Sequence, residues 1–160
     1  MKKRVLFVCL GNICRSPAAE GIMLEFVKRA KLEHLVEVDS AGTGAWHIGE
    51  APDDRMIRHA RQRGYDLSQL VGRQITAPDD FAKFDYILTM DNANLRDVRA
   101  LDREQVHHHK IQPLVEYCRI HSIKEVPDPY YKDETGFEHV LDLLEDACTE
   151  LLNKIQRELA

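Results

Sequence analysis

A cysteine and an arginine stand six positions apart near the start of the chain. Cys9 and Arg15 enclose five residues, and Ser16 follows the arginine directly. A thiolate is a nucleophile, and the planar guanidinium of arginine holds two oxygens of a tetrahedral anion at once. Short motifs of this kind also arise by chance, so the weight of this spacing depends on the elements that surround it.

The residues around this pair predict a strand, a tight loop and a helix. Residues 4–10 are almost all apolar, as in a strand that is buried on both faces of a parallel sheet. Gly11 and Asn12, which tolerate a left-handed backbone, indicate a turn. Ser16 before a proline is typical of a helix N-cap, and apolar residues then recur at helical spacing as far as residue 30.

The loop between Cys9 and Ser16 is predicted to bind a tetrahedral oxyanion such as phosphate. Backbone N–H groups that turn inward at a helix N-terminus form a nest for such an anion. Thiols in this position beside arginine titrate at about 3.5 to 7.5 instead of about 8.5, which predicts a thiolate at Cys9. Arg15 in a first helical turn is electrostatically unfavourable without an anion nearby, so it too indicates a bound ligand.

Alternating strand and helix patterns continue along the rest of the chain. Further strands are expected at residues 36–39, 86–90 and 110–114, and helices at 54–63, 92–101 and from a capping box of Thr135 and Glu138 onward. Repeated strand–helix units predict an α/β fold, a single doubly wound domain over residues 1–160 with a four-stranded parallel sheet and helices on both faces. Ligands bind such sheets beyond the carboxyl ends of the strands, where Cys9 is placed.

Composition and charge argue against several classes of protein. The chain has 160 residues, of which 44% are hydrophobic, enough for one core. A formal net charge of -5 without a long single-sign run disfavours a nucleic-acid or membrane-surface partner. No apolar stretch approaches the roughly 20 residues of a membrane-spanning helix. No secretory signal is recognised, so we expect a cytoplasmic protein with reduced thiols at Cys9, Cys14, Cys118 and Cys148.

The segment from Cys9 to Ser16 resembles the entire phosphate loop of the low-molecular-weight protein tyrosine phosphatases. Far along the chain, Asp128-Pro129-Tyr130-Tyr131 is similar to the general-acid loop of that family. The resemblance runs in the right order along essentially the whole chain. Its other matches are Ser40 to Thr43 after the second expected strand, Trp46 beyond it, and Met90-Asp91 after the third.

The resemblance implies a two-step hydrolysis of phosphotyrosine that needs no metal and no other cofactor. Cys9 attacks phosphorus while Asp128 protonates the departing phenolic oxygen, and Arg15 clamps the phosphate. Water then hydrolyses the phosphocysteine, with Asp128 acting as general base. The family comparison assigns phosphate and substrate binding to Leu10, Gly11, Asn12, Ile13, Cys14, Ser16, Trp46, Tyr130 and Tyr131.

The resemblance also implies supporting roles around the loop. Ser16 stabilises the sulfur as a thiolate, and Asn12 and Ser40 brace the loop by hydrogen bonds. Asp91 corresponds to a support residue that works with a histidine in many members. This chain has Leu70 at the position of that histidine, four residues before the glutamine of an Arg-Gln pair, which leaves the role of Asp91 open.

The expected partner is a phosphotyrosine-containing protein, with phosphate or another oxyanion able to occupy the loop. We expect a monomer or a weak dimer. A loop that curls around phosphate brings Cys14 back towards Cys9, within the separation of about 4.4 to 6.8 Å between Cα atoms that a disulfide tolerates. Cys14 is therefore expected to capture Cys9 after its oxidation by peroxide.

Several other interpretations remain open. Arsenate reductases share this loop and fold but relay a disulfide through additional cysteines, whereas Cys118 and Cys148 look like packing residues. Protein arginine phosphatases carry a threonine at the position of Ile13. A metal site at residues 107–109 with Cys118 is disfavoured, because three consecutive histidines do not face one ion easily. A non-catalytic phosphotyrosine-binding module would lack the nucleophile or the acid, and this chain has both.

Overall fold

The strands form one parallel sheet in a computed structural model that describes all 160 residues. The central strand β1 (Lys3–Cys9) pairs with β2 (Val36–Gly42) on one side and with β3 (Tyr86–Thr89) on the other. The short strand β4 (Ile111–Pro113) pairs with β3, which gives the order β2-β1-β3-β4. Every pairing is parallel, so the predicted four-stranded parallel sheet is confirmed.

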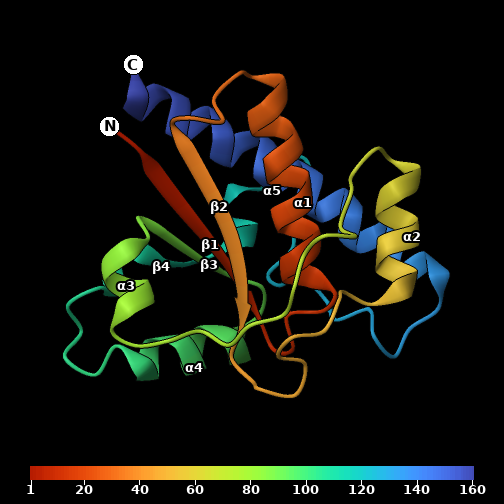
Figure 1. The fold of residues 1–160 in the computed structure, drawn as a ribbon, viewed down its shortest axis with the longest axis horizontal. Helices are drawn as coiled ribbons and strands as arrows, with labels where there is room; N and C mark the ends of the chain where they lie inside the picture. The colour runs from red at the N-terminus through yellow and green to blue at the C-terminus, as the bar shows by residue number, and fades with distance from the viewer.

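Helices cover both faces of the sheet, as predicted for a doubly wound fold (Figure 1). One face carries α1 and α5 side by side, with α2 packed against them, and the other carries α3 and α4. Two short 3-10 helices, η1 (His108–Lys110) and η2 (Leu114–Tyr117), flank β4. The five α-helices are α1 (Arg15–Arg29), α2 (Asp54–Gln62), α3 (Asp79–Lys83), α4 (Asn92–Leu101) and α5 (Glu134–Leu159).

Successive side chains of β1 enter two separate cores. Val5 and Phe7 belong to the larger core, which β1 shares with α1 and α5. Leu6 and Val8 point the other way, into a smaller core with α3 and α4. Side chains alternate between the faces of a strand, so a strand covered on both sides is apolar throughout. This is why the sequence shows an unbroken apolar run here.

The first helix begins earlier than the sequence indicates. Its first residue is Arg15, and Cys14 occupies the N-cap without a side-chain hydrogen bond. The prediction of Ser16 as N-cap is wrong, because Ser16 lies inside the first turn and its hydroxyl hydrogen bonds to the side chains of Cys9 and Asn12. The loop from Cys9 to the helix is therefore shorter and tighter than expected.

The last helix also begins with a different cap. Asp133 is the N-cap of α5, and its carboxylate accepts hydrogen bonds from the backbone N–H and the hydroxyl of Thr135. The predicted capping box of Thr135 and Glu138 is wrong. Glu138 does not reach back to the helix start, because its carboxylate contacts basic side chains of α2 and the residues that follow it.

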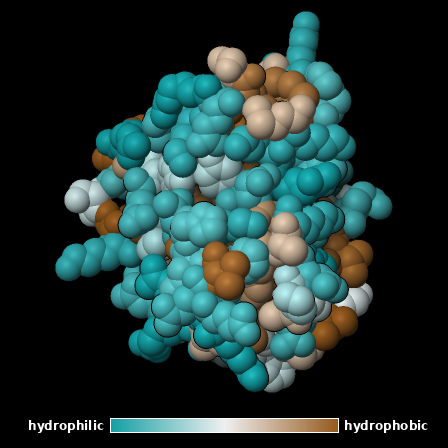
Figure 2. All heavy atoms as spheres, turned by 90° about the vertical axis from the view of Figure 1, so that its left-hand side faces the viewer, coloured by the Kyte–Doolittle hydropathy of each residue, from teal (hydrophilic) through white to brown (hydrophobic).

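The remaining element boundaries agree with the sequence to within three residues, and α4 agrees at both ends. Gly64, with φ of 92°, follows α2 in the left-handed conformation expected of a helix stop. The one-turn helix α3 was not predicted, because five residues are too few to show a helical period. On the face next to α3, hydrophobic side chains occur in small groups among hydrophilic ones (Figure 2). None of the helices combines the length and apolar composition that crossing a membrane requires.

Candidate active site

The strand order brings the Cys9 loop next to the segment that follows β3. The chain passes from β1 to β2 on one side and later returns to β3 on the other side of β1. Connections that leave adjacent strands in opposite directions open a crevice at the carboxyl ends of those strands. Cys9 is the last residue of β1, and Asp91 lies two residues beyond the end of β3. Both residues therefore lie at this edge of the sheet.

The sulfur of Cys9 is surrounded by hydrogen-bond donors at the N-terminal end of α1. The residue is 3% exposed. The backbone N–H of Asn12 donates to Sγ at 3.3 Å, and the hydroxyl of Ser16 lies 2.9 Å from Sγ. Either atom of the contact with Ser16 can be the donor, and the Ser16 oxygen itself accepts from the Asn12 side chain. The sulfur therefore lies among polar groups at the N-terminal end of α1.

Asn12 ties the loop to the neighbouring segments. Its φ is 58°, the left-handed conformation predicted for it. Its amide nitrogen donates to Ser16 Oγ at 2.8 Å and to Ser40 Oγ at 2.9 Å, and its Oδ1 accepts from the backbone N–H of Arg73 at 3.0 Å. Gly11 does not share the left-handed conformation, so Asn12 alone supplies it in this turn. A Cβ added at Gly11 would lie 3.1 Å from the His47 ring, so a side chain there requires this ring to shift.

Glu20 extends this network and was not identified from the sequence. It lies on α1 and is 8% exposed. The hydroxyl of Ser40 donates to its Oε1 at 2.6 Å, so a chain of hydrogen bonds runs from Glu20 through Ser40, Asn12 and Ser16 to Cys9. The spacing of Ser16 and Glu20 places both on one face of the helix, but no pattern in the sequence indicates the contact of Glu20 with Ser40.

Burial raises the pKa of Glu20 to about 7, with the hydrogen bond from Ser40 opposing and nearby Asp39 adding to the rise. The folded state therefore binds a proton that the unfolded state has lost, and the free energy of unfolding falls as pH rises from about 4.3 to about 7. Since one pKa unit corresponds to about 1.4 kcal/mol, this fall is on the order of 3 kcal/mol. We expect the free energies of unfolding of Glu20→Gln and of the unmodified protein, measured with urea, to diverge by that amount across this pH range. Parallel curves would contradict the prediction.

Arg15 is buried, and its side chain is fixed by two acceptors. Its Nη1 donates to Asp91 Oδ2 at 2.7 Å and to the carbonyl of Val126 at 2.9 Å. Asp91 is held in turn because its Oδ1 caps α4 by accepting from the N–H of Asn94 at 2.8 Å. Burial acts to lower the pKa of Arg15, but Cys9, Asp91 and Asp128 raise it overall, so the guanidinium stays charged. Asp91 contacts Arg15 without any contribution from residue 70.

Asp128 reaches the site from a different part of the chain. It lies between two prolines in the loop before α5, and its Oδ1 accepts from the backbone N–H of Tyr130 at 3.1 Å. Its Oδ2 is 3.7 Å from Arg15 Nη2. This contact brings together two side chains that are 113 residues apart in the sequence.

The nucleophile, the arginine and the carboxyl group face one cleft of about 430 Å³. Aromatic and aliphatic side chains form its mouth, as the sequence predicts, and His47 is an addition that the sequence did not indicate. Asn12, Ser16 and Asp91 do not line this cleft and instead hydrogen bond to Cys9 or Arg15, which do. Ser40 does not line it either and contacts the loop through Asn12. The lining residues are Cys9, Leu10, Gly11, Ile13, Cys14, Arg15, Trp46, His47, Asp128, Tyr130 and Tyr131.

The other cysteines occupy different environments. Cys14 is buried in the loop beside Cys9, and burial raises the pKa of its thiol. Cys148 is fully buried in α5 and belongs to the larger core. Cys118 packs against that core, and burial raises its pKa to about 12. Neither Cys118 nor Cys148 lines the cleft, so a disulfide relay of the reductase type finds no third thiol at the site.

The consecutive histidines at residues 107–109 make separate contacts. His108 Nδ1 hydrogen bonds to Asp102 at 2.6 Å, while the His107 ring stacks on Phe81 with centroids 6.0 Å apart. No group of three or more histidine, cysteine or acidic side chains gathers with the geometry of a metal site.

Comparisons with known proteins agree with this geometry. Residues 4–160 match the family model described as Low molecular weight phosphotyrosine protein phosphatase. A putative low molecular weight protein-tyrosine-phosphatase from Synechocystis is 49% identical over 156 residues, which cover 98% of each chain. The fold and the site therefore define a hydrolase of the protein phosphatase class.

Solved structures agree at the level of the whole fold. A protein tyrosine phosphatase from Entamoeba histolytica superposes with a TM-score of 0.93 at 42% identity, covering 99% of this chain and 100% of the other. An arginine phosphatase from Drosophila gives a TM-score of 0.87 at 35% identity, covering 97% and 98% of the two chains. The chain belongs to the low molecular weight phosphotyrosine protein phosphatase family.

Proposed function

We propose that this protein removes phosphate from phosphotyrosine in protein substrates through a phosphocysteine formed on Cys9. The observation that carries the proposal is the convergence of Cys9, Arg15 and Asp128 on one cleft. In the first step the Cys9 thiolate attacks phosphorus, and the bond from phosphorus to the phenolic oxygen breaks. Asp128 gives its proton to that oxygen, while Arg15 holds the phosphoryl oxygens as charge spreads over them.

In the second step the same residues hydrolyse the intermediate. Water attacks phosphorus, Asp128 as carboxylate accepts a proton of that water, and the sulfur–phosphorus bond breaks to regenerate the thiolate. The Ser16 hydroxyl at 2.9 Å from Sγ supports the thiolate as leaving group. Asn12 and Ser40 brace the loop, and Asp91 positions Arg15. No step requires a metal or another cofactor.

The walls of the cleft favour an aryl phosphate. Ile13, Trp46, Tyr130 and Tyr131 present apolar and aromatic surface around the phosphate loop, which suits a phenyl ring. The second candidate substrate is phosphoarginine, because an arginine phosphatase shares the fold. Ile13 supports the aryl substrate, since it places a branched aliphatic group at a position where arginine phosphatases carry threonine.

The function is tested with para-nitrophenyl phosphate in the presence of a chelator. We expect hydrolysis to continue with EDTA, and vanadate and inorganic phosphate to inhibit competitively, because they occupy the loop as oxyanions. Phosphoarginine and arsenate, assayed beside the aryl phosphate, should react far more slowly. Activity that disappears with EDTA and returns with zinc or magnesium would contradict the cysteine mechanism.

Oxidation of Cys9 should be reversible through Cys14. Peroxide converts the Cys9 thiolate to a sulfenic acid, and the thiol of Cys14 then displaces water to form a disulfide that dithiothreitol reduces. We expect phosphate to protect against inactivation and mass spectrometry to find the Cys9–Cys14 bond. Cys14→Ser should keep its activity but recover poorly after peroxide, whereas Cys118→Ser, outside the cleft, should recover normally. A disulfide from Cys9 to Cys118 or Cys148 would contradict this prediction.

The cellular setting follows from the same proposal. Four free thiols, one of which is the nucleophile Cys9, suit the reducing cytoplasm. The expected partner is a phosphotyrosine-containing protein, and the absence of nucleic-acid and membrane partners stays a prediction. So does the monomer or weak dimer, which sedimentation measurements would test.

A further inference from the structure

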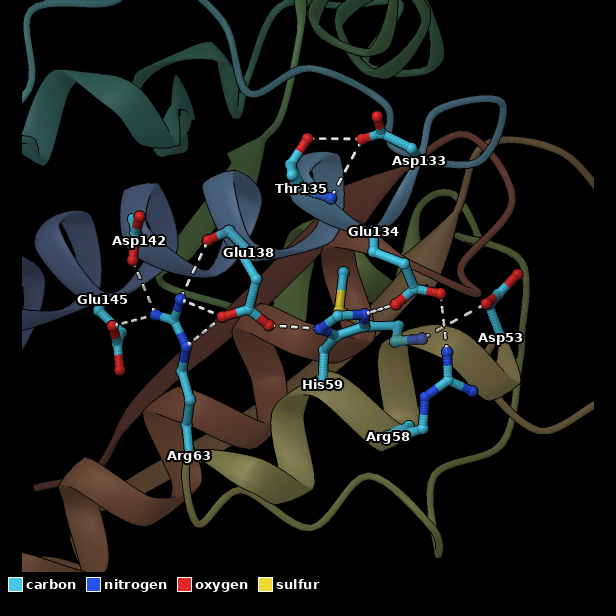
Figure 3. Close-up of polar contacts among 11 residues, drawn as sticks. Asp53, Arg58, His59, Arg63, Asp133, Glu134, Thr135, Glu138, Asp142 and Glu145 are labelled. Atoms are coloured by element: carbon cyan, nitrogen blue, oxygen red, sulfur yellow. Dashed lines mark hydrogen bonds and ion pairs between the residues drawn. The ribbon is translucent and has the colours of Figure 1, made fainter.

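His59 of α2 is a buried histidine whose two ring nitrogens both face carboxylates of α5 (Figure 3). Its Nε2 contacts Glu134 and its Nδ1 contacts Glu138, one helical turn further along. The ring stacks on Phe137, with centroids 5.6 Å apart and planes within 5° of parallel. His59 is 7% exposed. None of these residues lines the cleft of Cys9.

Two carboxylates can be satisfied by this ring only when the ring is protonated. Carboxylates accept hydrogen bonds, whereas a neutral imidazole has one N–H and one lone pair. The hydrogen bond from His59 is the largest cause that lowers the pKa of Glu134. The pKa of Glu138 is also lowered, because Arg63 and His59 together outweigh the effect of burial. Because a carboxylate faces each ring nitrogen, the ring donates to both glutamates only when both nitrogens carry an N–H.

The two glutamates differ in how strongly they depend on His59. Glu138 pairs with Arg63 at 2.7 Å, and Arg63 also pairs with Asp142 at 2.9 Å and Glu145 at 2.6 Å. Glu134 has one other partner, Arg58, at 2.9 Å. The Arg58 side chain is 52% exposed and the Glu134 side chain is 59% exposed. Exposed ion pairs contribute little because water and salt screen them. Glu134 is therefore the carboxylate that His59 chiefly holds.

Glu134 is also the end of the loop that carries Asp128. It is the first residue of α5, directly after the loop at residues 127–133. Apart from the contact of Asp128 with Arg15, that loop is hydrogen bonded to the rest of the protein at Tyr130, whose carbonyl accepts from Arg55 Nη2 at 3.1 Å. The Arg55 guanidinium also lies over the Tyr130 ring, 5.4 Å from its centroid. Because Arg55 belongs to α2, the same helix holds both the middle and the end of this loop.

We propose that protonated His59 is a positioning residue for Asp128. It fixes the first turn of α5 against α2, so the loop keeps its carboxyl group at the cleft, and it touches neither substrate nor sulfur. The proposal rests on the proposed function, in which Asp128 is the general acid. Without the N–H that faces Glu134, this carboxylate meets a ring lone pair and keeps only the exposed Arg58 as an ion-pair partner. The other carboxylates on this face of α5, Asp142 and Glu145, pair with Arg63.

The kinetic test compares a poor and a good leaving group. The glutamine of His59→Gln can donate toward only one glutamate at a time. We expect kcat/KM to fall about tenfold for phenyl phosphate and less than about threefold for para-nitrophenyl phosphate. Both losses are smaller than the loss of a general acid would cause. The inhibition constant of inorganic phosphate should not change, because the phosphate loop is separate. Arg58→Gln is the matched control, and both substrates should react with it as with the unmodified protein. Equal losses on both substrates would show a merely structural role.

Two further measurements keep the test decisive. In the unmodified protein at pH 6, NMR should detect an N–H on both ring nitrogens of His59, and a single tautomer would overturn the proposal. If His59→Gln fails to fold, Glu134→Gln, at an exposed site, should show the same selective loss on phenyl phosphate. Asp128→Ala separates the two failures. If that variant lacks leaving-group dependence, the proposed function fails; if it shows the dependence and Glu134→Gln does not, only the role of His59 fails.

Discussion

Cys9→Ser should abolish turnover and leave oxyanion binding intact. A serine hydroxyl is a far weaker nucleophile than a thiolate, so aryl phosphate hydrolysis should fall by ~10⁴-fold or more. In the proposed mechanism the loop backbone and Arg15 hold the phosphate, and the substitution removes neither. Calorimetry with inorganic phosphate or vanadate should therefore give affinities close to those of the unmodified protein. Cys118→Ser, outside the cleft, should retain full activity.

Arg15 should behave differently from Cys9, because it serves both binding and catalysis. Arg15→Ala removes the charged fork and leaves Asp91 facing the loop without its partner, so both turnover and phosphate binding should be lost. Arg15→Lys keeps the charge but not the planar pair of donors, and it should bind phosphate weakly while remaining inactive. Oxyanion binding that survives in both arginine variants would contradict the assignment of Arg15 as the phosphate clamp.

Asp128→Ala should slow the reaction by an amount that depends on the leaving group. Loss of a general acid costs on the order of 10²-fold or more when the departing oxygen is basic. Phenyl phosphate needs that proton, whereas para-nitrophenolate leaves readily without it. The measurement is kcat/KM over a series of substituted phenyl phosphates, plotted against the pKa of the leaving phenol. The slope should steepen in the variant.

Phosphate affinity provides the control for this experiment. The Asp128 carboxylate lies 3.7 Å from Arg15 and makes no hydrogen bond to the phosphate loop. Inhibition by inorganic phosphate should therefore persist in Asp128→Ala. Equal impairment on every leaving group would remove Asp128 from the acid role and assign it to the support of Arg15.

The sequence alone determined the fold class and the chemistry of the loop. The strand at residues 3–9 is apolar throughout because it is covered on both faces, and this local signal needs no knowledge of distant residues. Cys9, Asn12 and Arg15 are close in the chain, so their spacing already implies a nest at a helix N-terminus. The long final helix and its apolar face were likewise readable from periodicity.

Helix starts were less predictable than the helices themselves. Ser16 fits a helix N-cap by residue type, yet its hydroxyl hydrogen bonds to the sulfur of Cys9 instead. Thr135 and Glu138 match a capping box, yet Asp133 caps the helix and Glu138 pairs with Arg63. In both places the side chain makes a tertiary contact instead of the capping contact that the local sequence pattern predicts.

Contacts between distant segments were decided only by the tertiary structure. Glu20 looks like an ordinary helix-surface residue until β2 places Ser40 against it, and its raised pKa follows from that burial. His59 lies 75 residues from Glu134, and no spacing in the sequence indicates their contact. A periodic pattern reports which face of an element is buried, but not which side chain of another element packs there. The partners of Glu20 and His59 therefore depend on how the helices pack against the sheet and against each other.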